Sequence, residues 1–138
     1  WICCGGWMRI DKLAHLSYRS TFAHQGFVVC SVEYRTSNEG CYPMQIEDVK
    51  AAIRYLKAHA DRYRIDKEHF GAMGESAGGF LTCMAALDHD KARDVGEYLE
   101  ESSSIQAACP WYPPTNLSTF KYKDAEECAA SMESLLLG

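Results

Sequence analysis

The hydrophobic residues of this chain fall into runs that alternate between strand-like and helix-like patterns. Residues 27–34, FVVCSVEY, form a near-continuous apolar run of β-branched and aromatic residues, which is typical of a strand buried on both faces of a parallel sheet. Two shorter apolar runs, residues 69–74 and 105–111, and the opening residues 1–3 also fit buried strands. The pattern therefore predicts several buried strands, with residues 27–34 in the centre of the sheet.

Helix-like patterns lie between these runs. After Pro43, apolar residues recur at helical spacing and predict an amphipathic helix of about four turns. Its apolar face holds Ile46, Val49, Ile53 and Leu56, and its other faces hold Glu47, Asp48, Lys50, Arg54 and Lys57. Residues 77–87 predict a second helix, and a last helix starts near Asp124. Strands and helices that alternate at these lengths form βαβ crossovers, so we expect an α/β fold with helices on both faces of a parallel sheet, a three-layer α/β/α sandwich.

Composition narrows the class of protein without indicating a function. The chain has 138 residues, of which 47% are hydrophobic and 24% charged, and it has no repeats, so we expect one domain over residues 1–138. A net charge of −5 provides no basic surface, which argues against a nucleic-acid partner. No apolar run approaches the roughly 20 residues of a membrane-spanning helix, and the first residues lack a signal-peptide pattern.

The cysteines indicate a compartment. Seven cysteines are an odd number, and several lie in apolar runs where cysteine acts as a small hydrophobic residue, so we expect a reducing, cytoplasmic location. The adjacent Cys3 and Cys4 would point apart in a strand and are not expected to form a disulfide. No paired C-x-x-C or Cys/His cluster at ligand spacing occurs, so the sequence predicts no metal site.

A candidate nucleophile follows one of the predicted strands. Gly74-Glu75-Ser76-Ala77-Gly78 matches G-x-S-x-G between a strand and a helix, the context in which this motif presents a serine. Such a turn is so tight that its flanking positions must be glycine, and the helix that begins at Ala77 directs free N–H groups toward an oxyanion. The alternatives are a turn that merely packs or a phosphate loop. The phosphate loop is disfavoured because no lysine follows the glycines and their spacing does not fit G-x-G-x-x-G.

A second glycine motif precedes the nucleophile by about 70 residues, where serine hydrolases place the loop that supplies another oxyanion N–H. In Cys4-Gly5-Gly6-Trp7, two consecutive glycines let the bare backbone approach a substrate oxygen, although a simple turn would also use them. Because ligands bind at the carboxyl ends of parallel strands, both motifs lie where chemistry is expected.

Three motifs in this order resemble one known family. They are the WICCGGW of Trp1 to Trp7, similar to W-I-H-G-G-G-W; Tyr34-Arg35, Glu39, Tyr42-Pro43 and Asp48, similar to Y-R-x-x-x-E-x-x-F-P-x-x-x-x-D; and the GESAGG of Gly74 to Gly79. The chain thus resembles the acetyl-esterase and hormone-sensitive-lipase-like branch of the α/β hydrolases, including carboxylesterases of the BD-FAE type. The resemblance implies a partial α/β-hydrolase fold without a cofactor, in which Ser76 is the nucleophile and Gly5, Gly6 and Ala77 form the oxyanion hole.

The chain departs from this family in two places. Cys3 stands where the family has histidine and Cys4 where it has the first glycine, and a side chain at position 4 would disfavour a positive φ.

The base and acid of a catalytic triad are not evident. The only histidine after Ser76 is His89, which a helix would carry about 15 Å away, so we expect it to be exposed. We expect the other histidines to be structural or exposed residues; they are His15, His24, His59 and His69. Asp124, Glu126 and Glu127 come too early for the family's acid and fit the start of a helix. The resemblance therefore implies that the acid and the histidine lie beyond Gly138. We expect the chain to be a fragment that is inactive by itself and prone to associate.

The leading functional hypothesis is a serine carboxylester hydrolase that acts on small-molecule esters with short acyl groups such as acetyl. A serine peptidase of the prolyl-oligopeptidase type shares the elbow, but the Cys-Gly-Gly-Trp loop argues against it. A non-catalytic binding module on a hydrolase scaffold remains open because the base is absent.

Three further sets of residues, in or near these motifs, each have a structural and a functional interpretation. Trp7, Trp111 and Tyr112 either line the acyl site or belong to the core. Arg35 and Glu39 either form a buried ion pair or lie at the surface. Glu75 either orients the elbow through hydrogen bonds or only occupies the turn.

Overall fold

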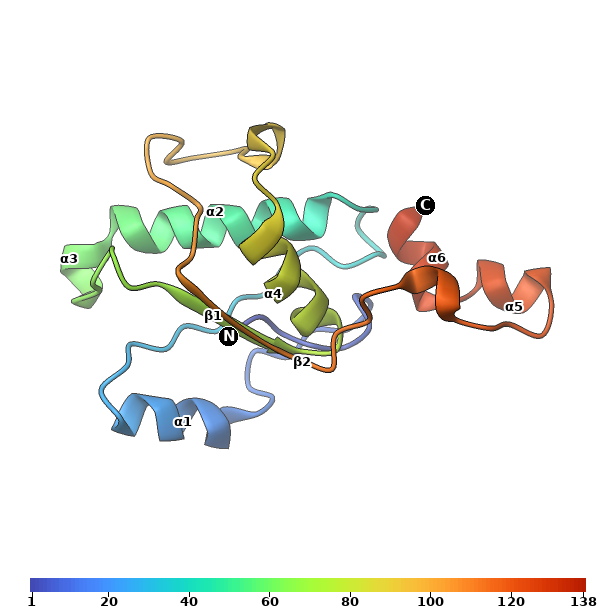
Figure 1. Cartoon of the computed structure of the whole chain (residues 1–138), viewed down its shortest axis with the longest axis horizontal. Coiled ribbons are helices and arrows are strands. Elements are labelled where there is room, and N and C mark those ends of the chain that lie inside the picture. Colours follow the sequence, from blue (N-terminus) through green and yellow to red (C-terminus); the bar gives the residue numbers. More distant parts are fainter.

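A parallel sheet lies between two layers of helix in the computed structural model, which describes residues 1–138 (Figure 1). Helices α2 and α4 cover one face of the sheet and α1 lies on the other, which confirms the predicted α/β fold. The helices are α1 (Leu16–His24), α2 (Met44–Ala58), α3 (Ala60–Tyr63), α4 (Ala77–Leu87), α5 (Ala125–Ala129) and α6 (Met132–Leu137). The strands are β1 (Gly71–Glu75) and β2 (Ala107–Trp111), and short 3₁₀ turns occur at Lys91–Arg93 and Leu117–Thr119.

All neighbouring segments of the sheet run parallel. β1 pairs with β2 from Gly71 opposite Ala107 to Glu75 opposite Trp111. On the other side of β1, Ile2 forms single parallel bridges to Gly74 and to Val32. The order across the sheet is therefore the segment around Val32, residues 1–3, β1 and β2. Because all four run in one direction, their carboxyl ends share one edge of the sheet.

The prediction that residues 27–34 form a strand buried on both faces is wrong. Only Val32 makes a bridge, and Phe27 and Val28 are 64% and 53% exposed. Their one neighbour in the sheet is the three-residue segment 1–3, which hydrogen-bonds to Cys30 and Val32 and does not reach Phe27 or Val28. The buried positions of the sheet belong instead to residues 1–3 and to Gly74 of β1.

The predicted helices form with their expected apolar faces. Ile46, Val49 and Ile53 of α2 are buried, and α4 spans the predicted residues 77–87. Asp124 caps α5 because its side chain accepts a 2.9 Å hydrogen bond from the Glu127 N–H, as expected for a helix start. None of these helices combines the length and apolar character needed to cross a membrane.

Three basic residues of α2 are buried in spite of their charge. Lys50, Arg54 and Lys57 are at most 4% exposed. They donate to main-chain carbonyls of residues 88–104, the segment that arches beyond α2 and α4 in Figure 1: Lys50 to Asp90 at 2.9 Å, Arg54 to Glu97 at 3.2 Å and Lys57 to Ser104 at 2.8 Å. Arg54 also pairs with the Asp94 carboxylate at 2.9 Å. These hydrogen bonds offset the cost of burying the charges.

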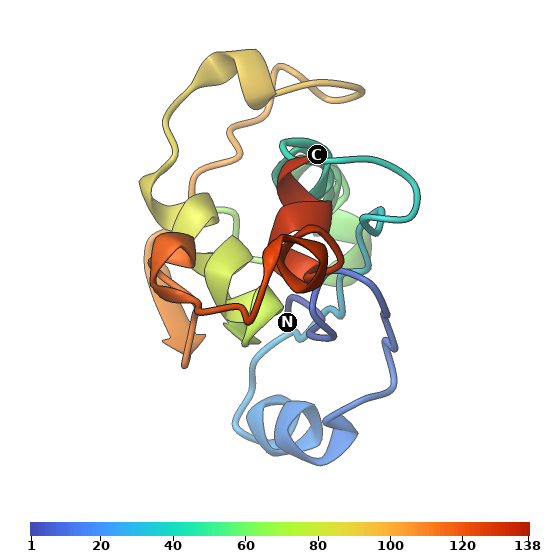
Figure 2. The ribbon, with the colours of Figure 1, turned by 90° about the vertical axis from the view of Figure 1, so that its right-hand side faces the viewer.

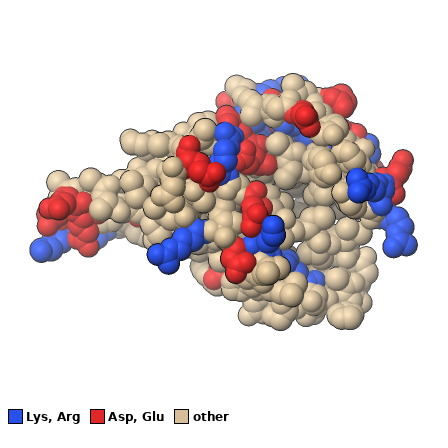
Figure 3. Space-filling view, turned by 180° about the vertical axis from the view of Figure 1, so that it is seen from behind, with Lys and Arg blue, Asp and Glu red and all other residues tan.

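The C-terminal helices pack beside the N-terminal loop. Leu136 of α6 is fully buried, and its carbonyl accepts a 2.7 Å hydrogen bond from the Tyr42 N–H. Figure 2 shows α6 in front of α2, with the N-terminal segment below it. On the face in Figure 3, acidic and basic side chains are interspersed among large uncharged areas.

Arg54 should contribute strongly to stability. Replacing it by alanine removes the closer of the two cationic partners of Asp94 and the donor to the Val95 and Glu97 carbonyls, so we expect Arg54→Ala to lower the free energy of unfolding by about 3 kcal/mol. Urea denaturation measures this change. The exposed Arg62 provides the control, since Arg62→Ala should cost less than about 0.5 kcal/mol. Equal losses in the two variants would contradict the assignment.

Candidate active site

Ser76 lies at a strained turn between β1 and α4. Its backbone has φ 54° and ψ −116°, a left-handed conformation that non-glycine residues rarely adopt and that clusters at functional sites. The Ser76 N–H donates to the Trp111 carbonyl at 3.0 Å, and its carbonyl accepts from the Phe80 N–H at 2.9 Å. Hydrogen bonds on both sides therefore hold the backbone in this conformation.

Three glycines make the turn possible. A Cβ at Gly74 would lie 2.5 Å from the Gly78 carbonyl oxygen and 2.8 Å from that of Ile2. One at Gly78 would lie 2.3 Å from the Ile2 oxygen, and one at Gly79 would lie 2.7 Å from the Trp111 oxygen. Each neighbour is backbone and cannot rotate away. Only hydrogen fits at these positions, which is the physical reason for the glycines of the motif.

The loop of residues 4–7 also depends on glycine. Gly5 and Gly6 have φ 126° and 61°, and a Cβ at Gly5 would lie 1.9 Å from the Arg9 carbonyl oxygen. Cys4 does not have a positive φ, so its side chain fits where a glycine was expected. The N–H groups of Gly5 and Gly6 donate to no acceptor within the protein, and the first N–H groups of α4, beginning with Ala77, have no partner inside the helix.

Tyr34 supports this loop from the core. Its hydroxyl donates to the Cys3 carbonyl at 2.9 Å, and burial raises the pKa of the hydroxyl well above its usual range. The tyrosine therefore stays neutral and keeps this hydrogen bond across ordinary pH.

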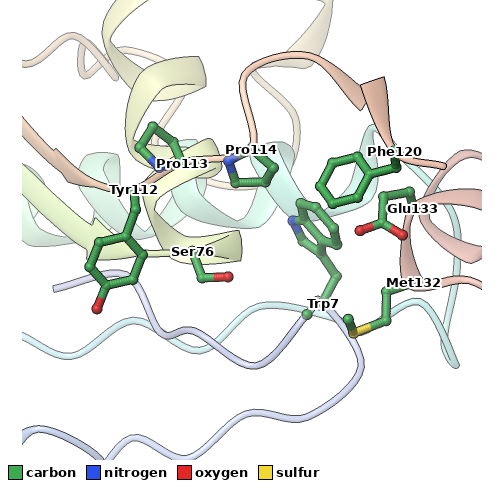
Figure 4. Close-up of a pocket in the computed structure, with 9 residues that line it drawn as sticks. Trp7, Ser76, Tyr112, Pro113, Pro114, Phe120, Met132 and Glu133 are labelled. Atoms are coloured by element: carbon green, nitrogen blue, oxygen red, sulfur yellow. The ribbon is translucent and has the colours of Figure 1, made fainter. Parts of the chain in front are cut away.

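One pocket brings the two glycine motifs together (Figure 4). It has a volume of about 280 Å³. Its lining comes from the loop, the elbow, the segment after β2 and the C-terminal region: Gly6, Trp7, Ser76, Tyr112, Pro113, Pro114, Phe120, Met132 and Glu133. Phe120, Met132 and Glu133 belong to no motif and are brought to Ser76 only by the fold, so they could not be expected as lining residues from the sequence.

The aromatic candidates divide between the pocket and the core. Trp7 belongs to both, because it lines the pocket and is only 2% exposed. Its ring packs edge-to-face against that of Phe80, with the ring centroids 5.5 Å apart. Tyr112 lines the pocket and is 70% exposed. Trp111 does not line this pocket and packs against Trp1 and Tyr18.

Arg35 forms its ion pair with a residue other than Glu39. Its guanidinium contacts both oxygens of Asp48, with the shortest distance 2.8 Å, and this contact raises the pKa of Arg35. Glu39 instead accepts from the N–H and the hydroxyl of Thr36. The ion pair joins the segment after Tyr34 to α2, which is a role in the fold.

Glu75 contacts His15, which was expected to be a structural or exposed residue. The His15 Nε2 lies 3.0 Å from a Glu75 oxygen and 3.7 Å from the Cys4 Sγ. Burial and the Glu75 carboxylate raise the pKa of the Cys4 thiol, and Glu75 also raises the pKa of the Tyr112 hydroxyl. Glu75 is 60 residues after His15 in the sequence, so no spacing rule could have grouped it with Cys4 and His15.

None of the five histidines lines the pocket with Ser76. His89 is exposed, as expected, and His69 pairs with Asp66 at 2.7 Å. His59 stacks on Tyr55, and His24 ends α1. The pocket therefore holds a serine and free backbone N–H groups, without an imidazole from these residues.

Comparisons with known proteins agree on one family. The BD-FAE family model matches residues 1–138. The probable carboxylic ester hydrolase LipM of Mycobacterium tuberculosis is 36% identical over 93 residues, which are 67% of this chain and 22% of LipM. A truncated carbohydrate esterase from gut microbiota superposes with a TM-score of 0.83 at 30% identity, over 99% of this chain and 53% of that one. The butyrate-bound esterase Est2 of Thermogutta terrifontis superposes with a TM-score of 0.75 at 27% identity, over 90% of this chain and 45% of that one. The chain thus spans about a fifth of LipM and about half of each solved structure.

The contacts of Gly74 lead to a stability test with a control in the same strand. Gly74→Ala should lower the free energy of unfolding by at least about 2 kcal/mol, because the new methyl group would meet backbone of α4 and of residues 1–3. At Gly71 the nearest atom to a Cβ is 3.6 Å away, so Gly71→Ala should be close to neutral. Chemical denaturation measures the free energy of unfolding of both variants. A Gly74→Ala protein as stable as Gly71→Ala would contradict the close contacts at Gly74.

Proposed function

We propose that this chain, which belongs to the BD-FAE family, carries the nucleophile and the oxyanion hole of a serine carboxylester hydrolase. The observation that carries the proposal is the position of Ser76, held at φ 54° between β1 and α4 in the pocket that it shares with Gly6. A left-handed serine at the carboxyl end of a parallel strand is the arrangement of a nucleophile elbow.

The proposed reaction begins with attack of the Ser76 Oγ on the carbonyl carbon of an ester. The free N–H groups of Gly5, Gly6 and Ala77 stabilise the negative charge that develops on the carbonyl oxygen. The alcohol leaves, an acyl group remains on Ser76, and water then hydrolyses the acyl-enzyme. The stabilisation requires no rearrangement, since the backbone of both motifs is held by its own packing and hydrogen bonds.

The base and the acid must come from elsewhere in the protein. A serine needs a base to take its proton, and no histidine of this chain lines the pocket. Since the chain spans 22% of LipM, we place the histidine and its carboxylate partner in parts of the protein outside these 138 residues.

Short acyl groups fit the proposed site best. The pocket measures about 280 Å³, and the apolar side chains of Trp7, Phe120 and Met132 line it. The similar esterase from Thermogutta terrifontis is described with bound butyrate, and another similar structure is a carbohydrate esterase. We therefore propose acyl groups from acetyl to butyryl as substrates, including acyl groups carried by sugars.

A fluorophosphonate probe tests the nucleophile in the full-length protein. The Ser76 oxygen would bond to phosphorus and fluoride would leave, so mass spectrometry should find the adduct on Ser76. Ser76→Ala should abolish labelling, whereas Ser102→Ala, a change at an exposed serine, should not. Absence of labelling in a folded sample would overturn the proposal and favour a binding module. In a labelled protein, hydrolysis of peptides in preference to esters would favour a peptidase.

The 138 residues by themselves should not turn over esters. A serine without its base loses most of its rate, so p-nitrophenyl acetate should be hydrolysed no faster than by the Ser76→Ala variant of the same chain. A clear difference between the two would mean that a residue of this chain supplies the base.

A further inference from the structure

A thiol, an imidazole and a carboxylate meet beside the elbow, and the proposed hydrolysis uses none of them. Cys4 comes from the N-terminal loop, His15 precedes α1, and Glu75 ends β1. One ligand atom from each, Sγ, Nε2 and a carboxylate oxygen, lies within 4.8 Å of the other two. Three segments far apart in the sequence therefore bring three different donor atoms to one point.

The separations of these atoms fit a tetrahedral metal site. Zinc lies about 2.3 Å from sulfur and about 2.0–2.2 Å from nitrogen and oxygen, which puts tetrahedral ligand atoms about 3.4–3.6 Å apart. The observed distances are 3.7 Å between the Cys4 Sγ and the His15 Nε2, and 3.0 Å between the Nε2 and the Glu75 oxygen. The Cys4 Sγ and the Glu75 oxygen lie within 4.8 Å of each other, so shifts of about 1 Å or less would bring all three atoms to bonding distance from one ion.

The imidazole is held in place by its surroundings. Its ring stacks on Tyr18 with centroids 5.8 Å apart and lies 5.6 Å from the ring of Trp1. The buried guanidinium of Arg19 donates to the carbonyls of Lys12 and Ala14, and so fixes the segment that leads into His15. Supporting contacts of this kind orient metal-ligating histidines.

The carboxylate is available to a cation. Glu75 makes no ion pair with a lysine or an arginine, and its one charge partner is His15. Its side chain is 19% exposed and that of His15 is 29% exposed, so an ion could reach both from solvent.

We propose that Cys4, His15 and Glu75 bind a divalent cation of the zinc type through Sγ, Nε2 and one carboxylate oxygen, with water in the fourth position. On binding, the Cys4 thiol releases its proton to solvent and the imidazole binds in its neutral form. Thiolate and imidazole select zinc and its transition-metal neighbours over magnesium and calcium, which prefer all-oxygen sites. The ion would join the residue before Gly5 to the residue before Ser76, and so tie the loop to the elbow.

Metal titration of the full-length protein tests this site without relying on activity. Zinc, measured in competition with a chromophoric chelator, should bind at one equivalent, and cobalt in its place should produce a thiolate-to-metal absorption band in the near-ultraviolet. X-ray absorption of the zinc form should find one sulfur ligand among nitrogen and oxygen ligands. A protein that binds neither metal at micromolar concentration would overturn the proposal.

Matched variants locate the site. Cys4→Gly, His15→Gln and Glu75→Gln should each weaken binding by at least about 100-fold, and Cys4→Gly should also abolish the cobalt band. Cys4→Ser retains the size of the side chain in case the glycine variant fails to fold, as judged by circular dichroism. Cys83→Ser changes another half-buried cysteine and should bind as the unaltered protein does. An unchanged cobalt band in both Cys4 variants would refute the assignment, as would loss of the band in Cys83→Ser.

Discussion

The close backbone contact of Ile2 with Gly74 and Gly78 is the constraint on which the rest of the site depends. The Ile2 carbonyl lies so close to both glycines that no side-chain atom fits between them. This approach lets α4 start directly at the end of β1, which gives Ser76 its left-handed backbone. It also brings residues 1–3 alongside β1, so that the loop that follows them ends at the same pocket as the serine. A single steric condition thus determines the positions of Ser76 and of the loop that holds the free N–H groups of Gly5 and Gly6.

Features governed by local sterics and periodicity could be predicted from the sequence. The bounds of α4 follow from the glycine turn before it and from an unbroken apolar run, and both are readable from neighbouring residues. The apolar face of α2 follows from spacing alone, since Ile46, Val49 and Ile53 recur at helical intervals and are buried together. The chemistry assigned to Ser76 rested on the same kind of local information.

Features that depend on partners distant in the sequence could not be predicted. The apolar run at Phe27 and Val28 is typical of a central strand, but burial requires a neighbour on each side, and the run gives no information about the length of that neighbour. Arg54 is charged and yet buried, because the carbonyls of Val95 and Glu97, about 40 residues later, accept its hydrogen bonds. The grouping of Cys4 and His15 with Glu75, 60 residues after His15, was hidden for the same reason.

The way in which α2 holds residues 88–104 has an evolutionary consequence. Lys50, Arg54 and Lys57 bind mainly to carbonyl oxygens, and every amino acid supplies one. The path of this surface segment is therefore largely independent of the side chains that it displays. Mutations can accumulate there, and new surface chemistry can arise, while the helix that anchors the segment and the sheet beneath it keep their geometry.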